Sequence, residues 1–241
     1  MYDPFETDAS LRYLGIMAKA FGQAIAMIGG WAVFYLVNDR YRQATGHEYL
    51  RSRDIDLMIS PEPKFAARFG SAIRKMGFVE GGLPFRYQLI IDRDSGAVLG
   101  EKEAARREPF DLIYIFLDVF SSKKVALGTW VIPELGKAFG GRRRLEGIQV
   151  APPGEVLKMK LRSYGERAAS EKREKDACDI YALLHYSSLD SMKLPNNPAL
   201  AAMAAEHSEY IAEALFHDRN YGGIVRRNIS SRIRGAEKRG E

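Results

Sequence analysis

Hydrophobic positions near the start of the chain change from helical to strand-like spacing and back. Apolar residues recur every three or four positions in residues 10–21, which predicts an amphipathic helix. The apolar run 24–28 then stops at Gly29 and Gly30, as expected of a buried strand that ends in a tight turn. Helical spacing returns in residues 31–42.

The middle of the chain is rich in strand patterns. Apolar and polar side chains alternate strictly in residues 54–60, which predicts a strand, and an amphipathic helix is expected at 64–76. The long polar stretch 93–108 is expected to be a loop. Further strands are expected at residues 85–91, 110–120, 125–131 and 145–150.

The pattern changes at the proline pair Pro152 and Pro153, after which nearly all segments have helical spacing. We therefore predict an α+β protein with two domains. A mixed β-sheet flanked by helices is expected at residues 1–151, and a helical domain at residues 152–241. The expected helices of the second domain are residues 155–169, 171–186, 199–216 and 221–239.

Composition limits the class of protein. The 241 residues are 46% hydrophobic and 28% charged, which is ordinary for a globular protein. There is no signal-peptide pattern, the longest apolar stretch is too short to cross a bilayer, and the single cysteine excludes internal disulfides. We expect a cytoplasmic protein without a membrane partner.

The net charge of +5 is typical of proteins that bind phosphate-rich ligands, although many other proteins share it. Part of the surplus lies in residues 142–144, where three arginines are consistent with contact to an RNA backbone or with a solvated hairpin edge.

Asp54 and Asp56 are the first candidates for chemistry. Carboxylates at positions i and i+2 of a strand project from the same face, and their repulsion is relieved by a cation between them. Mg²⁺ prefers such hard oxygen ligands, and two ions clamp the attacking and leaving oxygens of a displacement at phosphorus. The alternative interpretation is turn chemistry at a solvated strand end.

Gly29 and Gly30 fit the same interpretation. A backbone without Cβ atoms can approach a polyphosphate closely, and the helix that follows directs its N-terminal amides at the anion. An isolated glycine pair is more often a simple turn. The order of strand, glycine pair, helix and Asp-x-Asp strand favours a phosphate-binding site beside a metal site.

These residues resemble the signature of the DNA polymerase β-like nucleotidyltransferase superfamily. The similarity covers residues 28–30 (IGG) and 51–57 (RSRDIDL), and it is greatest to the AbiEii-type branch of abortive-infection and toxin–antitoxin systems. The resemblance implies a nucleoside triphosphate (NTP) substrate, two Mg²⁺ ions and a third carboxylate on a neighbouring strand. It also implies that Ser52 and Arg53 belong to the nucleotide site with the glycines.

Two residues are candidates for the third carboxylate, Asp111 and Asp118. They are seven positions apart on one expected strand and therefore lie on opposite faces. We prefer Asp118, because its apolar neighbours match the hydrophobic–Asp–hydrophobic pattern of the superfamily.

The resemblance extends into the helical region. It implies that Lys160 contacts the triphosphate and that Asp176 or Asp179 orients this lysine, or the base and ribose. Asp176 and Asp179 share one helical face at positions i and i+3. A solvated face in a dense run of mixed charges is the alternative interpretation.

The leading functional hypothesis is an enzyme that transfers a nucleoside monophosphate from an NTP to an acceptor hydroxyl and releases pyrophosphate. Its acceptor would be an RNA 3′ end such as that of tRNA, a protein or a small molecule, and an antitoxin protein is a possible partner. Trp31, which follows the glycines where the family has a hydroxyl residue, motivates an alternative. This is a catalytically silent module of the same fold that binds a protein or nucleic acid. A phosphohydrolase is a third hypothesis.

Overall fold

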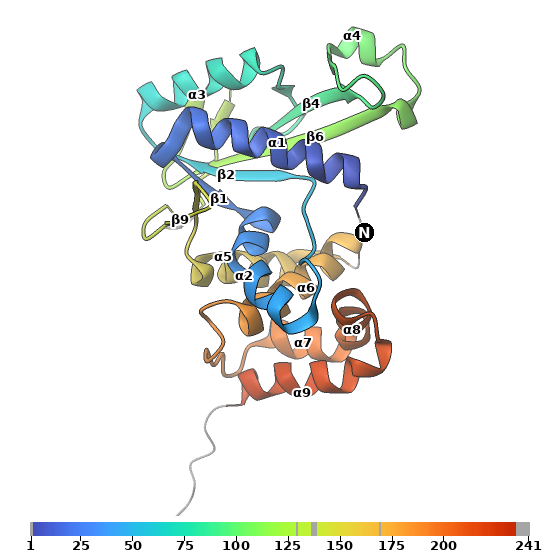
Figure 1. The fold of residues 1–241 in the computed structure, drawn as a ribbon. Coiled ribbons are helices and arrows are strands. Elements are labelled where there is room, and N and C mark those ends of the chain that lie inside the picture. The colour runs from blue at the N-terminus through green and yellow to red at the C-terminus, as the bar shows by residue number, and fades with distance from the viewer. Residues whose placement is uncertain (1, 129, 136–138, 169, 235–241) are drawn as a thin grey trace, which may run out of the picture. The chain divides into compact units, whose positions relative to one another are not determined.

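The computed structural model describes residues 2–128, 130–135, 139–168 and 170–234 (Figure 1). Contacts divide the chain into two compact units. Unit 1 comprises Met1–Ala32 and Arg51–Pro152, and unit 2 comprises Val33–Leu50 and Pro153–Glu241. Residues 33–50, which precede the predicted boundary at residue 152, thus group with the helical residues.

Unit 1 is built on a mixed sheet in the order β3-β4-β6-β2-β1-β10-β9, with β5 paired to β4. The pairs β2–β6 and β1–β10 are parallel, and the other pairs of this sheet are antiparallel. The strands are β1 (Ile25–Ile28), β2 (Ile55–Ile59), β3 (Val79–Glu80), β4 (Arg86–Asp92), β5 (Val98–Leu99), β6 (Leu112–Ser121), β9 (Arg143–Leu145) and β10 (Ile148–Val150).

Helix α1 (Pro4–Phe21) crosses the sheet of unit 1 and contacts β6 (Figure 1). It begins six residues before the expected start, because the Asp3 side chain accepts a hydrogen bond from the Phe5 amide and Pro4 suits the first helical turn. Helix α3 (Pro63–Lys75) packs on a separate hairpin formed by β7 (Val125–Leu127) and β8 (Trp130–Ile132).

Unit 2 is helical among the described residues. It contains most of α2 (Gly29–Thr45), whose first residues belong to unit 1, and buries a core that includes Tyr41, Tyr164 and Leu183. The other helices are α5 (Pro153–Glu166), α6 (Glu171–Tyr186), α7 (Pro198–Glu206), α8 (Ser208–Phe216) and α9 (Gly222–Ile233). The predicted α+β class, a mixed sheet flanked by helices and followed by helices, is confirmed.

Several elements of the structure differ in detail from those predicted from the sequence. The expected loop 93–108 contains β5 and the short helix α4 (Glu101–Ala104). The expected strands 125–131 and 145–150 each correspond to a hairpin, the second of which turns at Glu146 and Gly147, both with positive φ. Expected helix 199–216 is interrupted at His207, where the backbone leaves helical geometry. Thr129, Ala169 and residues 235–239 of the expected elements lie outside the described residues.

None of the helices in the described part of the chain combines the length and the apolar character needed to cross a membrane.

Candidate functional site

The sheet of unit 1 places charged residues in one row across neighbouring strands. Asp56 on β2 is the register partner of Asp118 on β6, and Asp118 is in turn the partner of Arg86 on β4. Register partners project from the same face, and neighbouring strands are about 4.8 Å apart. Asp118 therefore lies beside Asp56 on one face of the sheet. Asp111 lies in a 3₁₀ turn before β6.

Gly29 makes room for the Asp56 carboxylate. A Cβ atom at Gly29 would lie 1.9 Å from Oδ2 of Asp56, and the φ angle of +66° is itself unfavourable for other residues. A Cβ atom at Gly30 would similarly lie 2.6 Å from Oγ of Ser52. Two predicted site residues therefore pack directly on the glycine pair, at the point where β1 ends and α2 begins.

Trp31 is fully buried and does not take part in this site. Its indole Nε1 donates a hydrogen bond to Oγ of Ser10 in α1, over 2.8 Å. The large side chain after the glycines therefore belongs to the core of unit 1.

Ser52, Arg53 and Asp54 lead into β2. The Ser52 hydroxyl donates to the backbone carbonyl of Asp54 over 3.2 Å. The Arg53 guanidinium lies 3.7 Å from a carboxylate oxygen of Asp54 and 3.7 Å from one of Glu6. Arg53 is thus engaged mainly by carboxylates of unit 1.

Arg86 holds the predicted third carboxylate. Its Nε and Nη2 atoms donate to the two oxygens of Asp118, both over 2.7 Å, in a bidentate pair. These hydrogen bonds raise the pKa of Arg86, burial opposes them, and the charges of Asp118, Asp54 and Asp56 raise it further. One guanidinium thus lies within electrostatic reach of all three predicted carboxylates.

Sequence reasoning did not identify Arg86. It is the second residue of the predicted strand 85–91, and nothing in the local pattern distinguishes it from other arginines near strand ends. Only the antiparallel register of β4 on β6 places it opposite Asp118.

The three carboxylates have the donor chemistry that Mg²⁺ needs, but they are not arranged around a common ion position. Mg²⁺ takes hard oxygen ligands, which Asp56 and Asp118 offer from adjacent strands. Within the described ranges, however, no three Asp, Glu, His or Cys side chains are grouped so as to hold a metal ion. Both oxygens of Asp118 accept hydrogen bonds from Arg86, which leaves Asp54 and Asp56 as the better placed ligands.

The other predicted residues meet in unit 2, on α5 and α6. The Lys160 ammonium lies 2.8 Å from an oxygen of Asp176 and 2.7 Å from one of Asp179. Both carboxylates are almost completely buried, which excludes the alternative of a solvated face. Asp176 and Asp179 therefore both orient Lys160.

Three residues that the sequence did not single out complete this network. Arg167 pairs with Asp176, Lys175 pairs with Asp179, and the Tyr49 hydroxyl donates to Asp179 over 2.8 Å. Burial raises the pKa of Asp179, but the charges of Lys160 and Lys175 outweigh it and the pKa is lowered. Burial lowers the pKa of Lys160, but the same two carboxylates outweigh it and the pKa is raised.

Comparisons with known proteins give limited information. No family model matches the sequence, and no curated protein sequence is significantly similar to it. Among solved structures, an antigenic nucleotidyltransferase-like protein from Paracoccidioides brasiliensis is similar, with 15% identity, a TM-score of 0.46 and 95% of each chain covered. The Megavirus polyadenylate synthase has 15% identity and a TM-score of 0.39, with 82% of this chain and 37% of that chain covered. Both TM-scores are below 0.5, so these likenesses support no particular activity.

Proposed function

We propose that the protein is a Mg²⁺-dependent nucleotidyltransferase that moves a nucleoside monophosphate from an NTP to an acceptor hydroxyl and releases pyrophosphate. The observation that supports it is the row in unit 1, where Asp56 and Asp118 are register partners and Asp54 immediately precedes β2. Gly29, whose Cβ-free backbone accommodates the Asp56 carboxylate, lies beside this row.

Asp54 and Asp56 would hold two Mg²⁺ ions, and Asp118, which pairs with Arg86, would be the third carboxylate ligand. The ions would supply charge neutralisation at the phosphates. The chain itself would contribute amides at the start of α2 for the phosphate oxygens, with Ser52 and Arg53 beside them.

Lys160 would contact the triphosphate, with Asp176 and Asp179 as its orienting residues. The observation behind this proposal is that Asp176 and Asp179 hold the buried Lys160 ammonium in one orientation. RNA such as tRNA is among the acceptors to test, and an antitoxin protein is a further candidate partner. Both proposals rest on the sequence resemblance.

The direct test is transfer of label from each of four α-³²P-labelled NTPs to total tRNA or to total cell protein. We expect transfer with at least one NTP, and Asp54→Ala should reduce it by at least about a thousandfold, since it removes a ligand of both ions. Asp94→Ala, an exposed aspartate in the same unit, is the matched control and should retain full activity. Unchanged transfer by a folded Asp54→Ala protein would refute the metal assignment.

The silent-module alternative predicts no transfer and no NTP binding. Trp31 was its motivation, and the burial of this side chain against α1 explains the residue by packing instead. The packing role of Trp31 is the same under both hypotheses, so the transfer assay decides between them.

A further inference from the structure

Unit 1 contains a polar pocket at the opposite end of β1 and β2 from Asp56. Ile28 is the register partner of Asp56, whereas Ile25 pairs with Ile59. The pocket is lined by residues that flank this second end, including Ala24 and Ser60. Ile25 and Ile28 are three residue steps apart along β1, or about 10 Å. The pocket is therefore distinct from the carboxylate row.

The lining of this pocket is strongly positive. Lys64, Arg68 and Arg142 line it, against the single carboxylate of Glu62. In the part of the chain that the structure describes, none of these three cations forms an ion pair. Three cations without an acidic partner around one pocket attract an anion. Arginine binds phosphate well, because its guanidinium can donate two hydrogen bonds to it.

Arg142 is held in place by the backbone. It donates to the carbonyl of Phe139 over 2.8 Å and to that of Gln23 over 3.0 Å, and its guanidinium lies 4.2 Å from the centre of the Phe139 ring. Its Nε atom is buried and has no hydrogen-bond partner among the described residues. A preorganised guanidinium with unused donors loses little entropy when it binds a ligand.

The pocket also contains the planar side chains of two phenylalanines and two arginines. Arg68 lies 5.2 Å from the centre of the Phe65 ring, so the pocket contains two pairs of guanidinium and aromatic ring. Nucleic-acid bases stack on both kinds of plane. The pocket volume of about 560 Å³ lies in the usual range for ligand sites of roughly 300–1,000 Å³ and is ample for one nucleotide.

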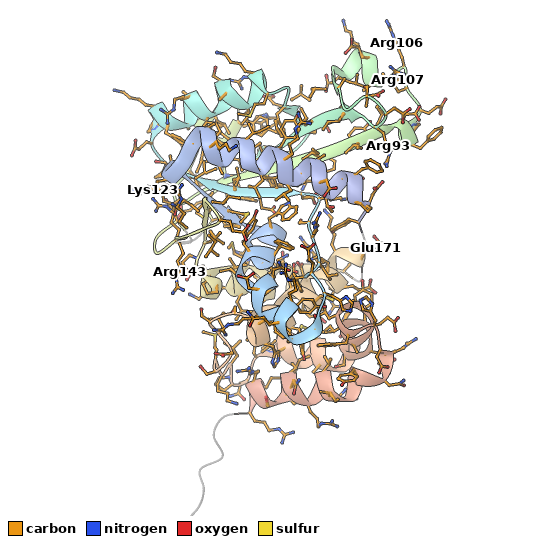
Figure 2. All side chains as sticks on the ribbon, in the orientation of Figure 1. Arg93, Arg106, Arg107, Lys123, Arg143 and Glu171 are labelled. Carbon is orange, nitrogen blue, oxygen red and sulfur yellow. The ribbon has the colours of Figure 1, made fainter. Side chains whose placement is uncertain are left out.

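We propose that this pocket binds a nucleotide unit, with the phosphate between Lys64, Arg68 and Arg142 and the base stacked on the guanidinium–aromatic pairs. The unit is either a free nucleotide or part of a single-stranded RNA. Two further cations, Arg143 and Lys123, extend outward on the side of unit 1 that carries β9 (Figure 2). The proposal does not depend on the transfer activity, because no carboxylate of the row takes part.

The test is fluorescence anisotropy of the full chain with a labelled single-stranded RNA of roughly 12 nucleotides, in EDTA so that no divalent ion contributes. Arg68→Gln removes one phosphate contact and leaves the hydrogen bonds of Arg142 intact. We expect the Kd to rise roughly tenfold and the slope of log K against log salt to fall by about 0.7. Arg106→Gln is the matched control: an exposed arginine on the α4 side of unit 1 (Figure 2), where the same change of charge should leave the Kd unaltered.

Competition separates the two sources of the nucleotide and tests the stacking. AMP should displace the RNA at a lower concentration than inorganic phosphate. Displacement by AMP at concentrations near the RNA Kd would indicate a free nucleotide, and much weaker displacement would indicate an RNA chain. Equal potency of AMP and inorganic phosphate would overturn the stacked base, and equal effects of Arg68→Gln and Arg106→Gln would overturn the pocket. Asp54→Ala should bind RNA as the wild type does, so failure of the transfer proposal would not affect this result.

Discussion

Arg86 is the residue that most affects the carboxylate row, because it supplies a positive charge to Asp118 in the absence of a metal ion. Its two hydrogen bonds use both oxygens of that carboxylate. A divalent ion that takes Asp118 as a ligand must therefore compete with the guanidinium. Arg86 would therefore set the free-energy cost of completing the proposed metal site.

Replacing Arg86 by Gln should have opposite effects with and without Mg²⁺. In EDTA the variant should be less stable than wild type by about 2–3 kcal/mol, since charged hydrogen bonds are lost and the carboxylates repel. Added Mg²⁺ should raise its melting temperature more than that of wild type, because Asp118 is then available. Thermal unfolding with and without the ion measures both effects.

Arg93→Gln provides the control for this prediction. Arg93 pairs with Asp3 over 2.6 Å at a more exposed site, so its loss should destabilise the fold less than the loss of Arg86 and leave the response to Mg²⁺ unchanged. A response of Arg86→Gln no larger than that of wild type would show that Arg86 does not compete with the ion.

At the scale of elements, α5 and α6 are joined by the buried network around Lys160. Its ammonium lies between Asp176 on one side and Asp179 on the other, and both carboxylates have second cationic partners. Breaking a buried pair by removing one partner typically costs about 3–5 kcal/mol. The network thus stabilises unit 2 in addition to any role with a nucleotide.

The pH dependence of unfolding should reveal this network. The lowered pKa of Asp179 means that the folded state binds fewer protons, so its contribution is complete above the ordinary value of 3.8 and is lost as pH falls through the folded pKa. Lys160→Met should be destabilised by about 3–5 kcal/mol at pH 7. The variant loses one of the two cations that lower the pKa of Asp179, so this pKa rises relative to wild type and the deficit of the variant in unfolding free energy should narrow on acidification. Urea unfolding from neutral pH down to about pH 3, below the ordinary value of 3.8, measures this.

Lys158→Met is the matched control on the same helix. Lys158 is largely exposed and pairs with Glu155 over 2.7 Å, so its loss should cost less than about 1 kcal/mol at every pH. A Lys160→Met deficit that stays constant or widens on acidification would contradict the assigned network.

Element types could be predicted from periodicity, but their interruptions could not. The 199–216 pattern is helical throughout, and the break at His207 occurs where the sequence has neither glycine nor proline. The hairpin at Glu146 and Gly147 was not expected, because the strand pattern continues across a two-residue turn. Short apolar runs carry too few positions to distinguish one strand from two.

At the scale of the whole molecule, the sequence predicts the α+β class and the gathering of Asp54, Asp56 and Asp118 about one end of β2. It does not predict that residues 33–50 group with the helical unit, since the Tyr49 hydrogen bond to Asp179 joins positions far apart in the chain. Nor does it predict Arg86 or the basic pocket. The position of Arg86 depends on the register of β4 on β6, and the pocket is lined by segments far apart in the sequence. Local sequence patterns contain neither kind of information.

The central claim is that the carboxylate row binds a nucleotide together with Mg²⁺. Thermal unfolding with and without a saturating NTP and Mg²⁺ tests it most directly. A ligand at a hundred times its Kd adds about 2.7 kcal/mol, so the melting temperature should rise by roughly 5–10 °C for a chain of this size. Asp56→Asn should reduce the rise to that given by the same NTP in EDTA, which reports binding in the basic pocket alone, while the exposed control Asp94→Asn should keep the full rise. No rise in wild type with any of the four NTPs, or an undiminished rise in Asp56→Asn, would contradict the claim.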